Sequence, residues 1–551
     1  MIKEVLSIGI IFALIGCNSG GDGSRQKNDS PTAQGSVSGV VRDYHTGEPL
    51  EGVTISVSSQ VNPDTDSIST ESAADGSYTL EDIGISERFL LSAEMAQYGE
   101  VWNIFANTGN QADVLLSPLV LKAHINETLD STIENTLSSE GYEVVLLPEN
   151  SLVDQVGNPY SGQVITRITL IDPSSDASIM PGDFLAINEL SGETSHIESF
   201  GAIDVDLSDT AGNPLQLQQG KTATITIPLA SSIIGSNAPQ IMPLYYFDEA
   251  LGYWIEEGEA TLISTEAGFA YQGQIGRFST WNADMAYETV NVIGCVKDEH
   301  GQSVTGAKVI ASGRDYIGQS YEYSDAFGNF TVPVRKSSNV LISSISNAQS
   351  DTAIVDSLSI DTTMPSCLAL SQGAAIITLT WNENPRDLDT HFYGPIENDV
   401  GEFEVYFETK TVEVAGILFD LDVDDTSSYG PEVLTIPDFP LEGTYRYVID
   451  RYAGSSTIKD SPARVVLNLA GEIQVFSPDS ASGDSNHDYW HVFNLEVDVN
   501  GDVSVQPVQQ FSMNESAPAL GAPLMRIQSF NESSGSQVPT KKRELKYYSA
   551  D

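Results

Sequence analysis

The chain is poor in cationic side chains, and it has no long apolar run after its first residues. Only 25 of its 551 residues are Lys or Arg, against 77 that are Asp or Glu, so the formal net charge is −52 at pH 7. A surface of this sign repels phosphate groups, which argues against nucleic acid or anionic lipid as a partner. Beyond the first 17 residues, no stretch is long and apolar enough to span a bilayer as a helix.

Cysteine is scarce, with only Cys17, Cys295 and Cys367 present. Neither Cys295 nor Cys367 has a second cysteine or a histidine at ligand spacing, which argues against a zinc site. In an exported protein this even pair indicates a disulfide, and a loop of that length stabilises by about 4 kcal/mol in the chain-entropy model. Two separate buried thiols are the alternative.

Sequence motifs of catalysis are missing as well. The chain has no HExxH motif, no GxSxG elbow, no phosphate-binding Gly-Lys-Ser/Thr loop and no glycine fingerprint that opens a helix. We therefore expect a protein that is not an enzyme. Its length predicts three to five domains, and a hydrophobic content of 40% is enough for most of the chain to fold.

The first residues carry an export signal. Lys3 precedes an apolar run that starts at Val5 and ends in Leu14-Ile15-Gly16-Cys17, and this run is too short to span a bilayer. It resembles the lipobox of bacterial lipoproteins, which implies removal of residues 1–16 and attachment of acyl chains such as palmitate to Cys17. Several chains give lasting anchorage because each buried methylene adds about 0.8 kcal/mol. An ordinary secretory signal with a chance cysteine is the alternative.

The residue after the cysteine bears on location. Asn18 stands where an aspartate favours retention at the inner membrane of diderm bacteria. The lipoprotein resemblance therefore implies the outer membrane, and it leaves open whether the protein faces the periplasm or the cell surface. Residues 17–36 are rich in Gly, Ser, Asp and Asn and predict a flexible tether of about 20–25 Å. Residues 511–551 predict a disordered tail.

Two segments, 37–121 and 289–372, repeat one pattern of short alternating strands and turns. The motif Val37-Ser38-Gly39-Val40-Val41 returns as Val292-Ile293-Gly294-Cys295-Val296. The turn Asp75-Gly76 before Tyr78 returns as Asp325-Ala326-Phe327-Gly328 before Phe330. Both copies resemble the carboxypeptidase regulatory-like, transthyretin-like β-sandwich. This resemblance implies a scaffold, a stalk or a sugar-binding module without peptidase chemistry.

Between the repeats we expect a connector over 122–142 and a β-rich domain over 143–288. In the connector Ile125, Leu129, Ile133 and Leu137 recur every four residues, which predicts a short helix, with a pair of strands as the alternative. The domain contains Tyr253-Trp254-Ile255-Glu256-Glu257-Gly258 and Phe278-Ser279-Thr280-Trp281-Asn282, and these motifs resemble the β-rich domain of cartilage intermediate layer protein. Trp254 and Trp281 form either a sugar-stacking platform or part of a buried core.

The last domain is expected over 373–510. Its Pro385-Arg386-Asp387-Leu388-Asp389-Thr390-His391 signature resembles a bacterial domain of unknown function, which implies a fold but no mechanism. Strand alternation places Asp387, Asp389 and His391 on one face, and Asp420, Asp422 and Asp424 on one face of a second strand. Rows of like charge attract a cation, and carboxylates are calcium ligands, so these six residues predict a calcium site. A solvated or arginine-paired face is the alternative.

Together these features predict an all-β chain of β-sandwich modules, strung one after another behind a lipid anchor. The expected function is a non-enzymatic surface protein that binds a glycan or another surface protein, or that acts as a mechanical spacer. A metal-dependent hydrolase built on the Asp/His cluster is the alternative.

Overall fold

The structure is a computed structural model that describes most of the chain between residues 35 and 515. The predictions for Cys17, for nearly all of the tether and for the tail beyond 515 concern residues outside the described part of the chain, and they stay predictions. Within this range the structure leaves out short segments: 45–47, 60–67, 108–112, 117–118, 121–122, 175–176, 189–190, 231–232, 234, 299, 314, 347–348, 356–358, 373–374, 382–383, 398–400, 424–431, 462 and 470–471.

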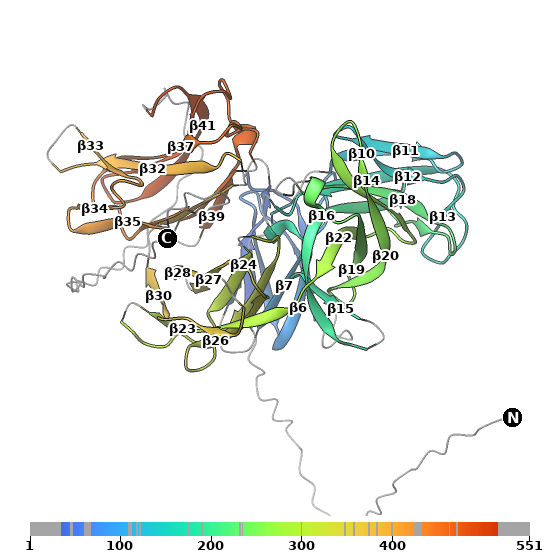
Figure 1. The fold of residues 1–551 in the computed structure, drawn as a ribbon, viewed down its shortest axis with the longest axis horizontal. Coiled ribbons are helices and arrows are strands. Elements are labelled where there is room, and N and C mark those ends of the chain that lie inside the picture. Colours follow the sequence, from blue (N-terminus) through green and yellow to red (C-terminus); the bar gives the residue numbers. More distant parts are fainter. Residues whose placement is uncertain are drawn as a thin grey trace, which may run out of the picture.

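The described chain is built from strands, and the all-β, multi-domain prediction is confirmed (Figure 1). Its only helical elements in this range are three one-turn 3-10 helices, Ala177–Ile179, Gly235–Asn237 and Pro478–Ser480. In the described part, no helix has the length and hydropathy needed to cross a membrane.

The first module packs two small sheets with the orders β5-β1-β8 and β4-β3-β6-β7. The third module, which consists of β23 to β30, repeats these pairings. Strands β26, β23 and β30 form one half, and β25, β24, β27 and β28 form the other. The strands of the first module are β1 Gly35–Val40, β2 Arg42–Asp43, β3 Thr54–Ser59, β4 Ile68–Glu71, β5 Ser77–Ile83, β6 Ser86–Glu94, β7 Val101–Asn107, β8 Asp113–Leu115 and β9 Leu119–Val120. Those of the third are β23 Thr289–Asp298, β24 Lys308–Gly313, β25 Gln319–Tyr323, β26 Asn329–Arg335, β27 Val340–Ser346, β28 Gln349–Val355, β29 Thr362–Thr363 and β30 Leu368–Gln372.

The repeat extends to individual hydrogen bonds. The Ser72 hydroxyl accepts a bond from the backbone N–H of Val53 at 2.9 Å and donates to the carbonyl of Leu50 at 2.6 Å. Ser324 makes the same two bonds in the third module, at 2.9 and 2.7 Å. Each serine thus joins two backbone segments that would otherwise leave polar groups unsatisfied.

Glycine recurs in the two copies for a steric reason. Gly76 and Gly328 have φ angles of +75° and +78°. A Cβ atom at either position would lie 2.6 Å from the carbonyl oxygen of Val41 or Val296. Only glycine avoids both the left-handed strain and this contact.

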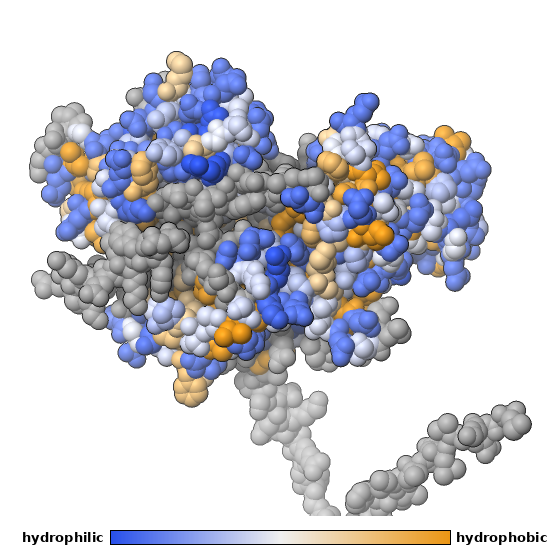
Figure 2. Space-filling view, viewed as in Figure 1, coloured by the Kyte–Doolittle hydropathy of each residue, from blue (hydrophilic) through white to orange (hydrophobic). Residues whose placement is uncertain are grey.

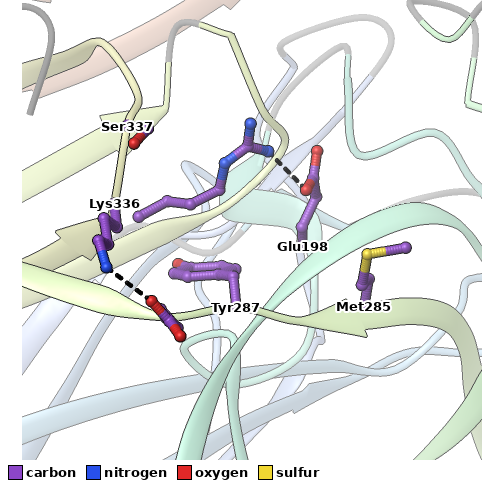
Figure 3. Close-up of a pocket in the computed structure, with 7 residues that line it drawn as sticks. Glu198, Met285, Tyr287, Lys336 and Ser337 are labelled. Carbon is purple, nitrogen blue, oxygen red and sulfur yellow. Dashed lines mark hydrogen bonds and ion pairs between the residues drawn. The ribbon is translucent and has the colours of Figure 1, made fainter. Parts of the chain in front are cut away.

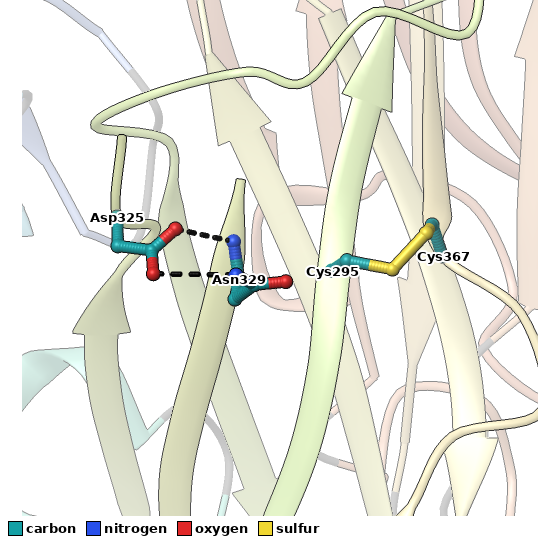
Figure 4. The surroundings of a disulfide bond; sticks show 4 residues. All are labelled: Cys295, Asp325, Asn329 and Cys367. Atoms are coloured by element: carbon teal, nitrogen blue, oxygen red, sulfur yellow. Dashed lines mark hydrogen bonds between the residues drawn. A yellow bond between two sulfur atoms is a disulfide. The ribbon is translucent and has the colours of Figure 1, made fainter. Parts of the chain in front are cut away.

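A disulfide distinguishes the two copies. Cys295 on β23 is bonded to Cys367 just before β30, with a Cα–Cα distance of 4.5 Å and a sequence separation of 72 (Figure 4). Val40 stands at the matching position of the first module. Figure 4 also shows Asp325 holding the neighbouring turn through the backbone N–H and side-chain amide of Asn329, at 2.8 and 3.3 Å.

The main sheet of the middle domain has the order β10-β14-β16-β22-β19-β20-β21-β18-β12-β11, with β15 pairing β16 and β20, and β13 pairs with β17 apart from it. Its first and last strands, β10 and β11, are consecutive in the chain, so the sheet curls around a single core. The strands are β10 Ile125–Asp130, β11 Asn135–Ser139, β12 Tyr142–Leu147, β13 Leu152–Val153, β14 Gln163–Ile171, β15 Leu185–Ile187, β16 Thr194–Asp209, β17 Gln216–Leu217, β18 Ala223–Pro228, β19 Ile241–Asp248, β20 Tyr253–Ser264, β21 Phe269–Ile275 and β22 Thr280–Ala286.

The helix expected in the 122–142 segment is wrong, and so is its assignment as a connector. Strands β10 and β11 lie there and pair with β14 and β12 of the middle domain. Residues four apart share a face on a strand as well as on a helix, and Ile125 and Leu129 are buried in this way on β10. Ile133 falls in the turn between the strands, where it is 56% exposed.

The C-terminal domain is a sandwich of two sheets with the orders β34-β35-β36-β31-β38-β39 and β33-β32-β37-β40-β41. One continuous apolar core fills the space between them. The strands are β31 Ala375–Thr380, β32 Asp387–Pro395, β33 Glu402–Val405, β34 Thr411–Val414, β35 Ile417–Val423, β36 Glu432–Ile436, β37 Gly443–Ala453, β38 Arg464–Leu469, β39 Glu472–Phe476, β40 Tyr489–Val497 and β41 Val503–Ser512.

The first module and the middle domain share a buried apolar cluster and are not separate beads. Leu90 and Ile104 of the first module pack there with Phe184, Phe247 and Trp254 of the middle domain. In Figure 1 the strands β6 and β7 accordingly lie beside β15. Burial of apolar surface between modules resists their relative motion, so the expected string of independent units is wrong at this junction.

Polar contacts reinforce the junctions. Arg88 of the first module forms two bonds to the Asp183 carboxylate, at 2.6 and 3.0 Å, and a third to the Gly252 carbonyl at 2.6 Å. The third module joins the middle domain through a backbone bond from Ser199 to Ile317 at 2.9 Å. The C-terminal domain meets the first module where the Arg464 guanidinium lies 4.1 Å from the centre of the Tyr44 ring.

Candidate functional site

The two tryptophans proposed as a sugar platform are both fully buried. Trp254 lies in the cluster between the first module and the middle domain, and its indole N–H donates to the Pro181 carbonyl at 3.1 Å. Trp281 lies in the core of the middle domain and donates to the Arg277 carbonyl at 3.1 Å. Neither ring face is available to a ligand, so the platform interpretation is wrong and the core interpretation holds.

A pocket of about 520 Å³ lies between the middle domain and the third module (Figure 3). Its charged side chains are paired with one another: Arg335 with Glu198 at 2.6 Å, and Lys336 with Glu288 at 2.8 Å. These pairs connect the two modules across the pocket, beside the ring of Tyr287. The two ion pairs therefore reinforce the junction between the middle domain and the third module.

The signature of the C-terminal domain has a structural role. Leu388 is fully buried in the core between the two sheets. Glu432, at the start of β36, is 1% exposed and accepts a bond at 2.5 Å from the backbone N–H of Thr390 on β32. A charge-assisted bond of this kind holds one sheet of the sandwich to the other.

Of the six residues predicted to bind calcium, only Asp387, Asp389 and His391 have side chains that the structure describes. Strands β32 and β35 belong to different sheets, and an irregularity in the β32 ladder separates Asp387 from Asp389. Both of these aspartates are almost completely buried. The side chains of Asp420 and Asp422, and all of Asp424, fall outside the described residues. Calcium binding at those three positions stays a prediction.

His391 instead belongs to a polar cluster on the outer face of the β33-β32-β37-β40-β41 sheet. Its Nδ1 lies 2.7 Å from a Glu404 carboxylate oxygen and 3.3 Å from the Tyr393 hydroxyl. The Tyr393 hydroxyl donates to Glu515 at 2.8 Å. One ligand atom each from His391, Glu404 and Glu515 lies within 4.8 Å of the other two.

Strand geometry explains how the cluster forms. On β32, Leu388, Thr390 and Phe392 face the core, so His391 and Tyr393 face outward. The pairing of β32 with β33 sets Glu404 directly opposite Tyr393 and diagonal to His391. Glu515 reaches the same place because the chain crosses this face after β41.

The cluster is acidic, and its histidine and tyrosine are buried, whereas Glu404 is half-buried and Glu515 is exposed. His391 is 6% exposed and Tyr393 5%. Burial, and then the bond to Glu515, raises the pKa of Tyr393 far above its ordinary value. Burial also raises the pKa of the neighbouring Asp450, which the charge of His391 partly offsets. Carboxylates thus gather around His391 on this face.

The nearby cation is already engaged. Arg446 binds both carboxylate oxygens of Glu402, at 3.0 and 2.6 Å, and donates to the backbone carbonyl of Glu515 at 2.8 Å. Its guanidinium also lies 4.3 Å from the centre of the Tyr393 ring. It therefore positions the segment that carries Glu515 and leaves Glu404 to His391.

Sequence reasoning found His391 but missed its partners. The alternation of Glu402, Phe403, Glu404, Val405 and Tyr406 predicts a strand with the carboxylates on its outer face, and that signal was available. No local pattern marks Glu515, which follows the last strand and is placed only by the fold.

No family model matches the chain. The chain is 32% identical over 134 residues to cartilage intermediate layer protein 2 of Homo sapiens, covering 24% of this chain and 10% of that protein. It is 30% identical over 118 residues to cartilage intermediate layer protein 1 of Sus scrofa, covering 20% of this chain and 18% of that protein. The resemblance to these proteins is confirmed, and the chain spans less than a fifth of the length of either.

Solved structures resemble the chain weakly. The major pilin SpaD of Corynebacterium diphtheriae has 8% identity and a TM-score of 0.15, and the alignment covers 63% of this chain and 100% of that one. The lipoprotein, regulatory-like and C-terminal resemblances stay predictions.

Proposed function

We propose that this protein is a non-enzymatic, lipid-anchored structural or adhesive protein of the outer membrane. Cys17 carries the acyl chains, and the partner is a glycan or another surface protein. The observation that carries the proposal is the apolar cluster shared by the first module and the middle domain. A chain built to hold or to bind at a distance from its anchor benefits when its modules are joined by buried contacts.

The contacts support this role in a specific way. A force applied to the middle domain passes to the first module through the apolar cluster and the Arg88–Asp183 pair. The face shown in Figure 2 is mostly hydrophilic, with small scattered apolar patches. Such a surface suits a protein in water whose partner is recognised by polar groups.

The anchor is tested by replacing Cys17 with serine in the full chain. We expect the unchanged protein to incorporate labelled palmitate and to fractionate with the outer membrane. We expect the Cys17→Ser variant to lose the label and to leave the membrane fraction. Protease treatment of intact cells distinguishes a surface from a periplasmic location. A Cys17→Ser variant that keeps both label and membrane association contradicts the anchor.

Binding is tested with the full-length protein in detergent, on a glycan array and in pull-down from envelope extracts. A specific glycan or surface protein is the expected result. If nothing binds, the mechanical spacer takes its place, and replacing one module by an unrelated sandwich then leaves the role intact. Turnover of esters, glycosides or phosphoesters that needs His391 and a divalent ion favours the hydrolase and overturns the non-enzymatic proposal.

A further inference from the structure

We propose that His391, Glu404 and Glu515 bind one divalent transition-metal ion, with Zn²⁺ as the representative, on the outer face of the C-terminal sheet. This ligand set shares only His391 with the six residues that the sequence predicted. The inference depends on the local geometry and makes no use of the lipid anchor or of a surface partner.

One ion could lie within bonding distance of all three ligand atoms after a small shift of the side chains. Ligands about 2.1 Å from a tetrahedral ion lie about 3.4 Å apart. The Nδ1 of His391 and its Glu404 oxygen are now 2.7 Å apart, and no two of the three ligand atoms are more than 4.8 Å apart. Glu404 is only half-buried and Glu515 is exposed, so both carboxylates are able to make the shift.

His391 brings a buried imidazole to the cluster. It is 6% exposed, and its Nε2 has no hydrogen-bond partner in the structure. Its Nδ1 lies beside the Glu404 carboxylate, and an ion bound there would take the place of the proton that the two atoms share.

The surrounding charge favours a cation. Glu404, Glu515 and Asp450 lie around His391, and Asp450 interacts electrostatically with both His391 and Glu515. Arg446 is held by Glu402, so it contributes a bond to the Glu515 backbone but none to the Glu404 carboxylate. A bound ion supplies the missing positive charge. The Tyr393 hydroxyl, which donates to Glu515, orients that ligand from outside the coordination sphere.

The donor set selects the class of metal. Calcium takes six to eight oxygen ligands, whereas imidazole nitrogen suits zinc, copper, iron and nickel. Of the three ligands here, one is an imidazole nitrogen. At this site we therefore expect a transition metal in place of calcium.

Metal binding would also hold Glu515, at the end of the described chain, to strands β32 and β33. Glu515 follows β41, whereas His391 and Glu404 lie on β32 and β33. An ion shared among them closes a long loop across the sheet, next to the contact of Asn514 with His491 at 3.1 Å. We expect metal to raise the stability of the C-terminal domain for this reason.

The test uses the full-length protein in detergent, stripped of metal with a chelator. Titration calorimetry with Zn²⁺ is expected to show one ion per chain and a higher melting temperature. Ca²⁺ is expected to bind at least about tenfold more weakly. The variants Glu404→Gln and Glu515→Gln are expected to weaken Zn²⁺ binding by about 10–100-fold or more. Both positions are at least partly exposed, so these variants are expected to fold.

Two variants serve as matched controls. His487, 3.9 Å from Asp484, is a histidine–carboxylate pair in the same domain, so His487→Asn is expected to leave Zn²⁺ binding unchanged. Glu408, exposed and bonded to the Tyr406 hydroxyl, lies near the cluster without joining it, so Glu408→Gln is expected to do the same. Cobalt substitution with X-ray absorption is expected to report one nitrogen and two carboxylate ligands. Absent Zn²⁺ binding, equal loss in the controls, or tighter Ca²⁺ binding overturns the proposal.

Discussion

Several carboxylates gather around Arg167 at the junction between the first module and the middle domain. Arg167 pairs with Asp206 at 2.7 Å and lies 3.6 Å from Glu94. Burial, and then the nearby charge of Glu249, raises the pKa of Glu100 to about 9. Glu100 lies on a loop of the first module. The preceding residue, Gly99, packs so closely against Thr169 of β14 that a Cβ atom there would lie 2.6 Å from the threonine hydroxyl. Replacing Glu100 by glutamine removes this charge and keeps the shape.

The sign and size of the effect follow from the raised pKa. Because the folded state prefers protonated Glu100, this group contributes most stability below its ordinary pKa of 4.5 and loses it as the pH rises through about 9. At pH 7.5 the penalty is about 4 kcal/mol at about 1.4 kcal/mol per pH unit. Glu100 is only partly buried, and solvent screening reduces the penalty to about 1–2 kcal/mol.

We therefore expect Glu100→Gln to stabilise the protein by about 1–2 kcal/mol at pH 7.5 and to leave it unchanged near pH 4.5. Urea unfolding at both pH values measures the difference. Glu259, an exposed glutamate on β20, supplies the control Glu259→Gln, which is expected to change little at either pH. A Glu100→Gln variant that is equally or less stable at pH 7.5 would refute the reasoning, because the carboxylate would then be solvated or well paired.

Three further predictions concern an ion pair between modules, the repeated serines and the disulfide. Arg88→Ala leaves a buried carboxylate unpaired, so we expect a loss of about 3–5 kcal/mol in urea unfolding and faster proteolysis of the first module. Ser72→Ala and Ser324→Ala each remove the same pair of bonds, so we expect losses of about 1–3 kcal/mol that agree between the two copies. Replacing Cys295 and Cys367 together by alanine is expected to destabilise the third module by about 4 kcal/mol, as followed by denaturation of oxidised and reduced protein.

A specific result would contradict each of these three predictions. An Arg88→Ala variant with unchanged proteolysis would mean that the apolar cluster alone holds the junction, and Arg88→Lys tests whether charge without the two-pronged geometry is enough. Serine variants that differ widely would contradict the equivalence of the repeats. Reduction that leaves the unfolding of the third module unchanged would contradict the stabilising role of the disulfide.

Local chemistry in the sequence was enough to predict much of the fold. Alternation of apolar and polar residues predicts strands because side chains on a strand change face at every residue. The glycines at 76 and 328 mark turns because only glycine tolerates their φ angles and the nearby carbonyl oxygens. These signals depend on a few neighbouring residues, so they survive without knowledge of the rest of the chain.

The sequence by itself determined the strand-rich modules, their repeat and the turns between them, because each depends on bonds made within a few residues. Tertiary structure alone decided the strands at 125–139, since a spacing of four fits a helix face and a strand face alike. It also buried Trp254, because another module covers it, and it brought Glu515 to His391 from the far end of the domain. Such contacts join residues that no local period relates, so only the packed chain defines them.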